Sequence, residues 1–222
     1  MCGRFNLAES PAVDNLCLSF GIDSDALRYS GDIAPGAIIS IIYQVKSDFL
    51  ISDAIWSLLL DTDTLKPHRK YATFNTRSDK LHQPRSIGYK SFRTSRCIIP
   101  ASAFIEGLGD RKTYHKIEFE KEAVAFGGLY KEWVSKETGE IIRSASIITL
   151  PSLPQWEKIH PKSFPLMLPG SGDVRRQWLN PCSQDVAEFE ELLKPRIQTP
   201  QIVTPIGKVS LWNEIGESRI IQ

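Results

Sequence analysis

Short segments with the residue pattern of β-strands recur along most of this chain. They lie at Ala37–Tyr43, Phe49–Trp56, Tyr71–Asn75, Arg96–Pro100, Tyr114–Phe119, Ala123–Tyr130, Ile141–Thr149 and Ile202–Val209. Helical spacing is confined to Pro11–Phe20, Asp173–Leu179 and Gln184–Leu193. Parallel strands need long crossover connections, and these helices are too few to supply them. The sequence therefore predicts an α+β fold: a mostly antiparallel, partly closed, barrel-like β-sheet core with flanking helices.

The chain carries no internal repeat, low-complexity tract or Gly/Ser-rich linker that would divide it. With 222 residues, 41% of them hydrophobic, it is long enough to bury a substantial core. We therefore expect residues 1–222 to form one compact domain, and a monomer is the default expectation for such a domain.

The four cysteines (Cys2, Cys17, Cys97 and Cys182) are widely spaced and form neither a CxxC pair nor a Cys/His cluster. A zinc site or a disulfide framework is therefore not expected, and no metal or other cofactor is predicted. Reduced thiols fit the cytosol. No secretion signal is recognised, and no apolar stretch approaches the roughly 18 residues of a membrane span. We expect a cytoplasmic protein, nucleoid-associated if prokaryotic, that does not bind membranes.

Basic residues are concentrated in one part of the chain. The net charge is only +1, yet the window 66–96 carries Lys66, Arg69, Lys70, Arg77, Lys80, Arg85, Lys90, Arg93 and Arg96 against the single acid Asp79. The window sums to +8 and the remainder to −7. A segregated basic segment is what phosphate binding requires, although a merely solvated face would give the same pattern.

The chain begins Met1-Cys2-Gly3-Arg4-Phe5. A small second residue allows removal of the initiator methionine, which would leave an N-terminal cysteine. Its α-amine has a pKa of about 7.7–8.0 and its thiol about 8.5, so both are partly reactive near neutrality. Together they can condense with an aldehyde to a Schiff base and then to a thiazolidine ring. Taken alone, Cys2 could equally be an incidental residue of a terminus.

Four segments stand out as an ordered set: MCGRF at 1–5, FNTRSD at 74–79, RCIIPASAFIEG at 96–107 and KIHPKSFPLML at 158–168. Each has an ordinary structural explanation: Asn75 as a turn residue, Glu106 as a surface acid before a glycine turn, and His160 as a core or loop histidine. Taken together, they resemble the SOS-response-associated peptidase (SRAP) family, whose members crosslink to abasic sites in single-stranded DNA. The resemblance extends over nearly the whole chain.

The resemblance implies a role for each matching residue. Cys2, after loss of Met1, would be the nucleophile that forms a thiazolidine with the C1′ aldehyde of the opened deoxyribose. Asn75 would orient the linkage, Glu106 would shuttle protons, and His160 would assist opening of the sugar. Basic and polar positions would contact DNA or line the site: Arg4, Arg77, Arg85 and Thr149. A carboxyl and an imidazole whose pKa values are shifted toward neutrality can carry out these proton transfers.

Two departures from the family pattern are visible. The family tryptophan after the glutamate is replaced by Gly107, and the segment after His160 is one residue longer. Because aromatic stacking contributes about 1–3 kcal/mol per base, we expect the first change to affect DNA affinity more than chemistry.

The leading hypothesis is covalent capture of abasic sites in single-stranded DNA, which would shield them from strand cleavage. The first alternative is an N-terminal-cysteine peptidase or hydrolase in which Cys2 attacks an amide. The second is a non-reactive binder of DNA junctions, which would survive Cys2→Ala.

Overall fold

Five strands close into a barrel in the computed structural model of the protein, which describes residues 2–170 and 173–222. They are β3 (Ile38–Val45), β4 (Asp48–Trp56), β6 (Arg96–Ala101), β9 (Val124–Val134) and β10 (Ile141–Pro151). Their order is β10-β4-β3-β6-β9, and pairing of β9 with β10 closes the circuit. Two short strands, β5 (Asn75–Arg77) and β11 (Ser163–Pro165), also pair with β10.

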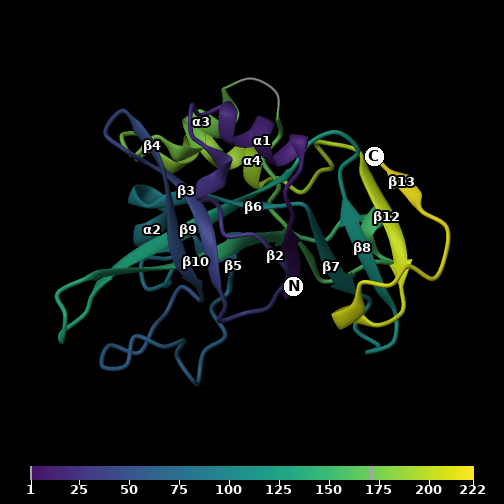
Figure 1. Ribbon diagram of the computed structural model, residues 1–222, viewed down its shortest axis with the longest axis horizontal. Helices are drawn as coiled ribbons and strands as arrows, with labels where there is room; N and C mark the ends of the chain where they lie inside the picture. Colours follow the sequence, from purple (N-terminus) through teal and green to yellow (C-terminus); the bar gives the residue numbers. More distant parts are fainter. Residues whose placement is uncertain (1, 171–172) are drawn as a thin grey trace.

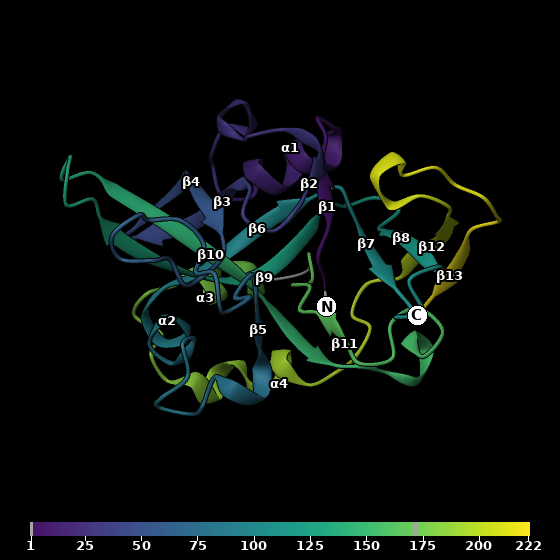
Figure 2. The same ribbon diagram turned by 90° about the horizontal axis from the view of Figure 1, so that it is seen from below.

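A second, antiparallel sheet lies beside the barrel (Figure 1). Its order is β13-β12-β8-β7-β1-β2, and its strands are β1 (Phe5–Leu7), β2 (Ser30–Ile33), β7 (Ala103–Gly107), β8 (Tyr114–Glu118), β12 (Gln201–Ile206) and β13 (Arg219–Ile221). In Figure 2, β1 lies between the barrel and β7. The start of the chain therefore runs where the two sheets meet.

Among the described residues, four short α-helices flank the sheets: α1 (Pro11–Leu18), α2 (Tyr89–Thr94), α3 (Val174–Leu179) and α4 (Glu190–Leu193). Helix α1 begins as its sequence predicts, because the Ser10 side chain accepts a hydrogen bond from the Val13 amide and Pro11 occupies the first turn. None of the described helices has the length and apolar character needed to cross a membrane.

One hydrophobic core joins the two sheets. Phe5 of β1 and Phe104 of β7 both make edge contacts with Phe126 of β9, with ring centroids 5.9 and 5.2 Å apart. On its other side, Phe104 stacks on Trp156 at 6.2 Å. Aromatic pairs of this kind contribute about 0.5–1.5 kcal/mol each beyond their buried area. They hold the strand that carries residue 106 against the barrel.

The predicted fold class is confirmed: the sheets are mostly antiparallel and the barrel is closed. Only β10–β4 and β10–β5 are parallel among the described strand pairs. The strand predicted at Tyr71–Asn75 is wrong, since β5 begins at Asn75. The reason lies in Thr73, whose carbonyl and hydroxyl accept hydrogen bonds from the amides of Leu58 and Leu59. These bonds tie the backbone to a neighbouring loop and not to the sheet.

Two other boundaries differ from expectation. The helix predicted at Gln184–Leu193 is a 3-10 turn, Val186–Phe189, followed by α4. Strand β12 ends at Ile206, because the Gly207 amide turns to bond the carbonyl of Asn213. The strands β1, β2, β11 and β13 have only three or four residues, too few for periodicity to reveal them.

Candidate functional site

Cys2 and Asn75 meet where β5 joins the barrel. Cys2 is fully buried, and its carbonyl oxygen accepts a hydrogen bond of 2.7 Å from Asn75 Nδ2. Asn75 is the first residue of β5 and lies opposite Ile147 of β10. The amide oxygen of Asn75 is buried and has no hydrogen-bond partner among the described residues. Asn75 therefore anchors the chain start through its nitrogen and keeps an acceptor oxygen facing the site.

Glu106 enters the same site from β7. Strand β1 pairs with β7 through Phe5 and Phe104, which carries Glu106 toward the residues preceding β1. The Glu106 side chain is only 2% exposed, and this burial raises the pKa of its carboxyl to about 7. Burial, and then the nearby Glu106 charge, raise the pKa of the Cys2 thiol well above its ordinary value. The thiol is therefore neutral at pH 7, while the carboxyl can exchange a proton there.

His160 completes the cluster from the segment that follows β10. Its Nδ1 lies 2.6 Å from the Gly107 carbonyl oxygen and 3.8 Å from Glu106 Oε2. Because a carbonyl oxygen only accepts, Nδ1 must carry a proton, and Nε2 holds the lone pair when the ring is neutral. Burial lowers the pKa of His160, which favours the neutral ring at pH 7. The site thus holds a carboxyl and an imidazole that can each take or give a proton.

The structure shows what surrounds Gly107, which replaces the family tryptophan after the glutamate. A Cβ at this position would lie 2.9 Å from the ring of Tyr114 on the paired strand β8. The Tyr114 ring therefore occupies the space beside the Gly107 backbone, and a larger residue there would displace it.

A groove of about 450 Å³ contains two more of the predicted residues, Arg77 and Thr149. The two are paired in the parallel β5–β10 register. The Thr149 hydroxyl is buried and has no hydrogen-bond partner among the described residues, whereas the Arg77 guanidinium is exposed and forms an ion pair with Asp79 at 2.7 Å. Lys162 also lines the groove. The sequence analysis assigned it no role, although its position two residues after His160 was a usable signal.

Arg4 and Arg85 occupy different settings. Arg4 forms an ion pair with Asp32 across the β1–β2 region, with Nε 3.1 Å from Oδ1. Arg85 is exposed in the loop before α2. Within the described residues, no hydrogen bond or ion pair joins Arg85 to the Cys2 cluster, so its predicted contact with DNA rests on its charge alone.

The basic window 66–96 is not one uniform surface, and this corrects the sequence interpretation. Arg96 is 3% exposed, and its guanidinium donates to five backbone carbonyls: Phe92, Arg93, Trp178, Asn180 and Ser183. Arg93 donates to the carbonyls of Leu81 and Tyr89. These two arginines tie elements of the fold together, and they are not part of a phosphate-binding face.

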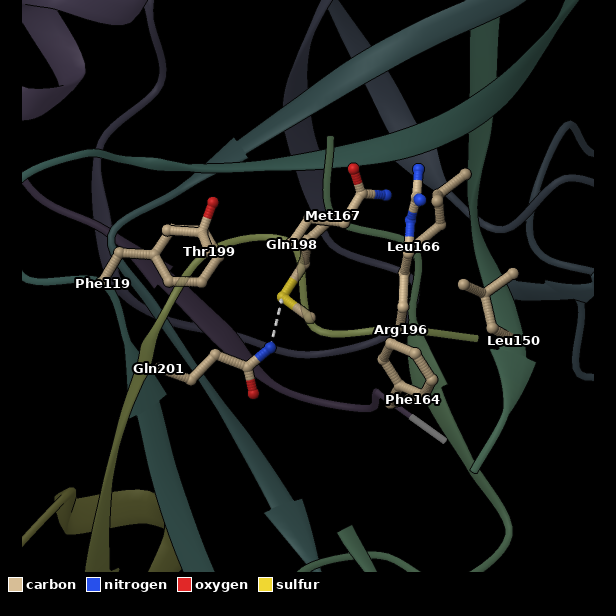
Figure 3. A pocket seen from close by; sticks show the side chains of 9 residues that line it. All are labelled: Phe119, Leu150, Phe164, Leu166, Met167, Arg196, Gln198, Thr199 and Gln201. Carbon is tan, nitrogen blue, oxygen red and sulfur yellow. Dashed lines mark hydrogen bonds between the residues drawn. The ribbon is translucent and has the colours of Figure 1, made fainter. Parts of the chain in front are cut away.

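A second cavity can be set aside as a substrate site. Its lining includes Phe164, Leu166, Met167 and Gln201, whose Nε2 donates to the Met167 sulfur at 3.9 Å (Figure 3). Its volume is about 10 Å³, close to the minimum of roughly 10–15 Å³ needed for one water molecule. The part of the chain that the structure describes also contains no group of three His, Cys, Asp or Glu side chains arranged to hold a metal ion.

A model of the SOS response associated peptidase (SRAP) family matches residues 1–209. A search among curated proteins finds no match. Solved structures with the same fold include a protein from Bacteroides thetaiotaomicron, with 23% identity, a TM-score of 0.71, and coverage of 95% of this chain and 94% of that one. A protein from Bordetella bronchiseptica has 17% identity and a TM-score of 0.70, covering 93% and 100%. A phage-related protein from the same organism has 17% identity and a TM-score of 0.66, covering 92% and 94%.

Proposed function

Because the chain belongs to the SOS response associated peptidase family, we propose that it captures abasic sites in single-stranded DNA as a covalent adduct of Cys2. The observation that carries the proposal is the convergence of Cys2, Asn75, Glu106 and His160 from four distant segments. These are the four residues to which the resemblance assigns the chemistry.

The chemistry follows from the groups present. An abasic deoxyribose is mostly a closed hemiacetal. His160 Nε2 can accept the proton of the C1′ hydroxyl and return it to the ring oxygen, so that the C1′–O4′ bond breaks and the aldehyde forms. The neutral α-amine of Cys2 then adds to C1′, and one of its protons moves to the carbonyl oxygen, which gives a carbinolamine. Glu106 in its acid form protonates the hydroxyl, which departs as water, and the resulting carboxylate takes the N–H proton of the iminium, which leaves a neutral imine. Addition of the Cys2 sulfur to the imine carbon moves the thiol proton to nitrogen and closes the thiazolidine.

This scheme requires that Met1 be removed, since only an N-terminal cysteine has both groups on one residue. Met1 lies outside the described residues. Intact-mass measurement of the purified protein tests this requirement directly. A protein that retains Met1 and still forms a thiazolidine adduct would contradict the scheme.

DNA would approach along the groove that contains Arg77, Thr149 and Lys162. Arginine and lysine at its rim supply contacts to phosphates, and such contacts position a strand without reading its sequence. Binding should therefore depend on salt, with a log–log slope of about −0.7 per phosphate contacted by single-stranded DNA.

The state of Cys2 favours this proposal over amide hydrolysis. A cysteine peptidase needs a thiolate, which nearby positive charge normally stabilises. Here burial and Glu106 raise the pKa of the thiol, and this works against attack on an amide from solution. Ring closure is intramolecular, so a mostly neutral thiol at high effective concentration is sufficient.

The test is a denaturing gel of the protein mixed with single-stranded DNA that contains one abasic site, beside Cys2→Ala and Cys2→Ser. We expect a heat-stable shifted band with the wild type only. A band that persists in Cys2→Ser would rule out the thiazolidine. Binding in native gels without any adduct would favour the non-reactive binder, and Cys2-dependent cleavage of peptides would favour the hydrolase.

A further inference from the structure

His115 lies next to Glu106 on the neighbouring strand of the second sheet. Strands β7 and β8 pair in antiparallel register, and Glu106 is directly opposite His115. Residues opposite each other in such a pair have side chains on the same face, with Cβ atoms about 4.5–5.5 Å apart. The pair Phe104 and Ile117, two residues further along, is fully buried. The face shared by Glu106 and His115 is therefore the one packed against the core.

The segment that carries His160 covers this face. Trp156 stacks on Phe104 of β7, and its Nε1 donates to the Gln201 side chain of β12 at 3.0 Å. Strand β8 lies between β7 and β12 in the sheet, and His115 is flanked by Glu106 on one side and Pro205 on the other. Its side chain is accordingly only 7% exposed.

Nothing in the fold of the described residues uses the Nδ1 atom of His115. This atom is buried and has no hydrogen-bond partner among residues 2–170 and 173–222. A buried imidazole nitrogen without a partner is costly unless a partner forms in another state of the protein. Of its two cross-strand partners, Glu106 of β7 and Pro205 of β12, only Glu106 is titratable.

We propose that His115 is a positioning residue of the Cys2 site, whose imidazole N–H donates to the Glu106 carboxylate whenever that carboxyl is ionised. The inference rests on the proposed function, because the ionised state arises when Glu106 gives its proton to the departing water. In the acid form, Glu106 needs no second donor. After proton release, a buried carboxylate does, and His115 lies on the same face of the β7–β8 pair, directly opposite Glu106.

The surrounding charges keep His115 neutral, as this role requires. Burial and the positive charge of Arg219 lower the pKa of His115. Among the described residues, Glu106 interacts with Cys2 and lies near His160, and Arg219 of β13 acts on His115. A neutral imidazole has one N–H to donate, so stabilisation of the carboxylate involves no further proton.

The proposed hydrogen bond should lower the pKa of Glu106 in the DNA-free protein, where no reaction takes place. Carbon-13 NMR of the glutamate carboxyls, with the Glu106 signal assigned by Glu106→Gln, measures its pKa in the DNA-free protein. His115→Phe keeps a buried aromatic ring but removes the donor, and should raise the pKa of Glu106 by about 0.5–1 pH unit. His115→Gln restores an N–H donor and should return most of the shift. Lys116→Gln, one residue away on the opposite face, is the matched control: it removes the ion pairs of Lys116 with Glu118 and Glu214 and should leave the pKa of Glu106 unchanged.

An unchanged Glu106 pKa in folded His115→Phe would overturn the inference, and so would equal shifts in the Phe and Gln variants. Should His115→Phe not fold, nitrogen-15 shifts of the wild-type His115 ring provide a second test. They should show a step at the Glu106 pKa that disappears in Glu106→Gln, and absence of that step is equally decisive. Both measurements need no DNA, so they separate failure of this inference from failure of the crosslinking proposal.

Discussion

Arg96 with its carbonyl partners (the Arg96 cradle) and the cluster around Glu106 are both buried and titratable, but they differ in how fully their polar atoms are hydrogen-bonded. The guanidinium of Arg96 donates to five carbonyls from α2, α3 and the segment after α3. At the candidate site, by contrast, Asn75 Oδ1, His115 Nδ1 and, in the groove, Thr149 Oγ1 are buried without partners among the described residues. Buried polar groups that are fully hydrogen-bonded stabilise the fold. Buried polar groups without partners remain available to form hydrogen bonds with a ligand or in another state of the protein.

The difference implies that substitutions in the two regions will have different effects. Substitutions of Arg96 should lower the free energy of unfolding strongly. The Glu106 cluster should tolerate removal of polar atoms, or gain stability, and lose function.

The largest effect is expected for Arg96→Met. It leaves five carbonyls without their donor and should lower the free energy of unfolding by about 3–4 kcal/mol, as measured by urea denaturation. Arg96→Lys keeps the charge but cannot reach all the carbonyls. Its free energy of unfolding should therefore lie between those of the wild type and Arg96→Met. If Arg96→Met were as stable as the wild type, the cradle would not be structural.

Glu106→Gln should have a smaller effect that depends on pH. The folded pKa is raised from 4.5 to about 7, so the folded state holds its proton more tightly than the unfolded chain. The contribution of Glu106 to wild-type stability should therefore be largest below pH 4.5 and fall as the pH rises to 7. Glu106→Gln should be more stable than the wild type by about 1–3 kcal/mol at pH 8 and nearly equal at pH 4. Thermal unfolding at the two values measures this, and a difference that grows toward low pH would refute it.

Thr149→Val should change stability still less. The hydroxyl has no hydrogen-bond partner within the described part of the chain, so its replacement by a methyl group of similar size should be neutral or stabilise by up to about 1 kcal/mol. Crosslinking to abasic DNA should nevertheless slow, because Thr149 lines the groove. Destabilisation beyond about 1 kcal/mol would reveal a structural role for this hydroxyl.

Arg77→Ala should leave stability unchanged, since its ion pair with Asp79 is exposed. It should weaken binding of single-stranded DNA at low salt and reduce the magnitude of the log–log salt slope by about 0.7. Fluorescence anisotropy across a salt series measures both. Arg28→Ala removes a comparable exposed pair with Asp53, does not line the groove, and serves as the control. Equal slopes for the two variants would contradict a phosphate contact at Arg77.

Much of the fold follows from local sequence pattern. The strands β3, β4, β6, β8, β9 and β10 are each predicted to within a few residues, because alternation and apolar runs are properties of consecutive residues. The cap of α1 is predicted for the same reason. The segment at Tyr71–Asn75 misleads, since its strand-like composition is overridden by hydrogen bonds from Thr73 to a distant loop.

The candidate site likewise has features that the sequence predicts and features that it does not. The ordered motifs predict Cys2, Asn75, Glu106 and His160 as site residues, and these four lie together in the structure. The burial of Glu106 could not be predicted, since a glutamate before a glycine turn usually lies at the surface. No role was expected for His115, although its alternate spacing with Ile117 and Phe119 was a usable signal of an inward-facing side chain. Nothing in the sequence placed it opposite Glu106.

The sequence alone specified the β-rich class, the family resemblance and the residue types available for chemistry, because these depend on neighbours along the chain. Closure of the barrel, pairing of β1 with β7, and the division of the arginines into Arg96 inside and Arg77 outside depend on contacts between residues far apart in sequence. Such contacts form only when the whole core packs at once. For that reason the raised pKa of Glu106 and the burial of His115 Nδ1, away from any partner in the described residues, belong to the folded molecule and not to its sequence pattern.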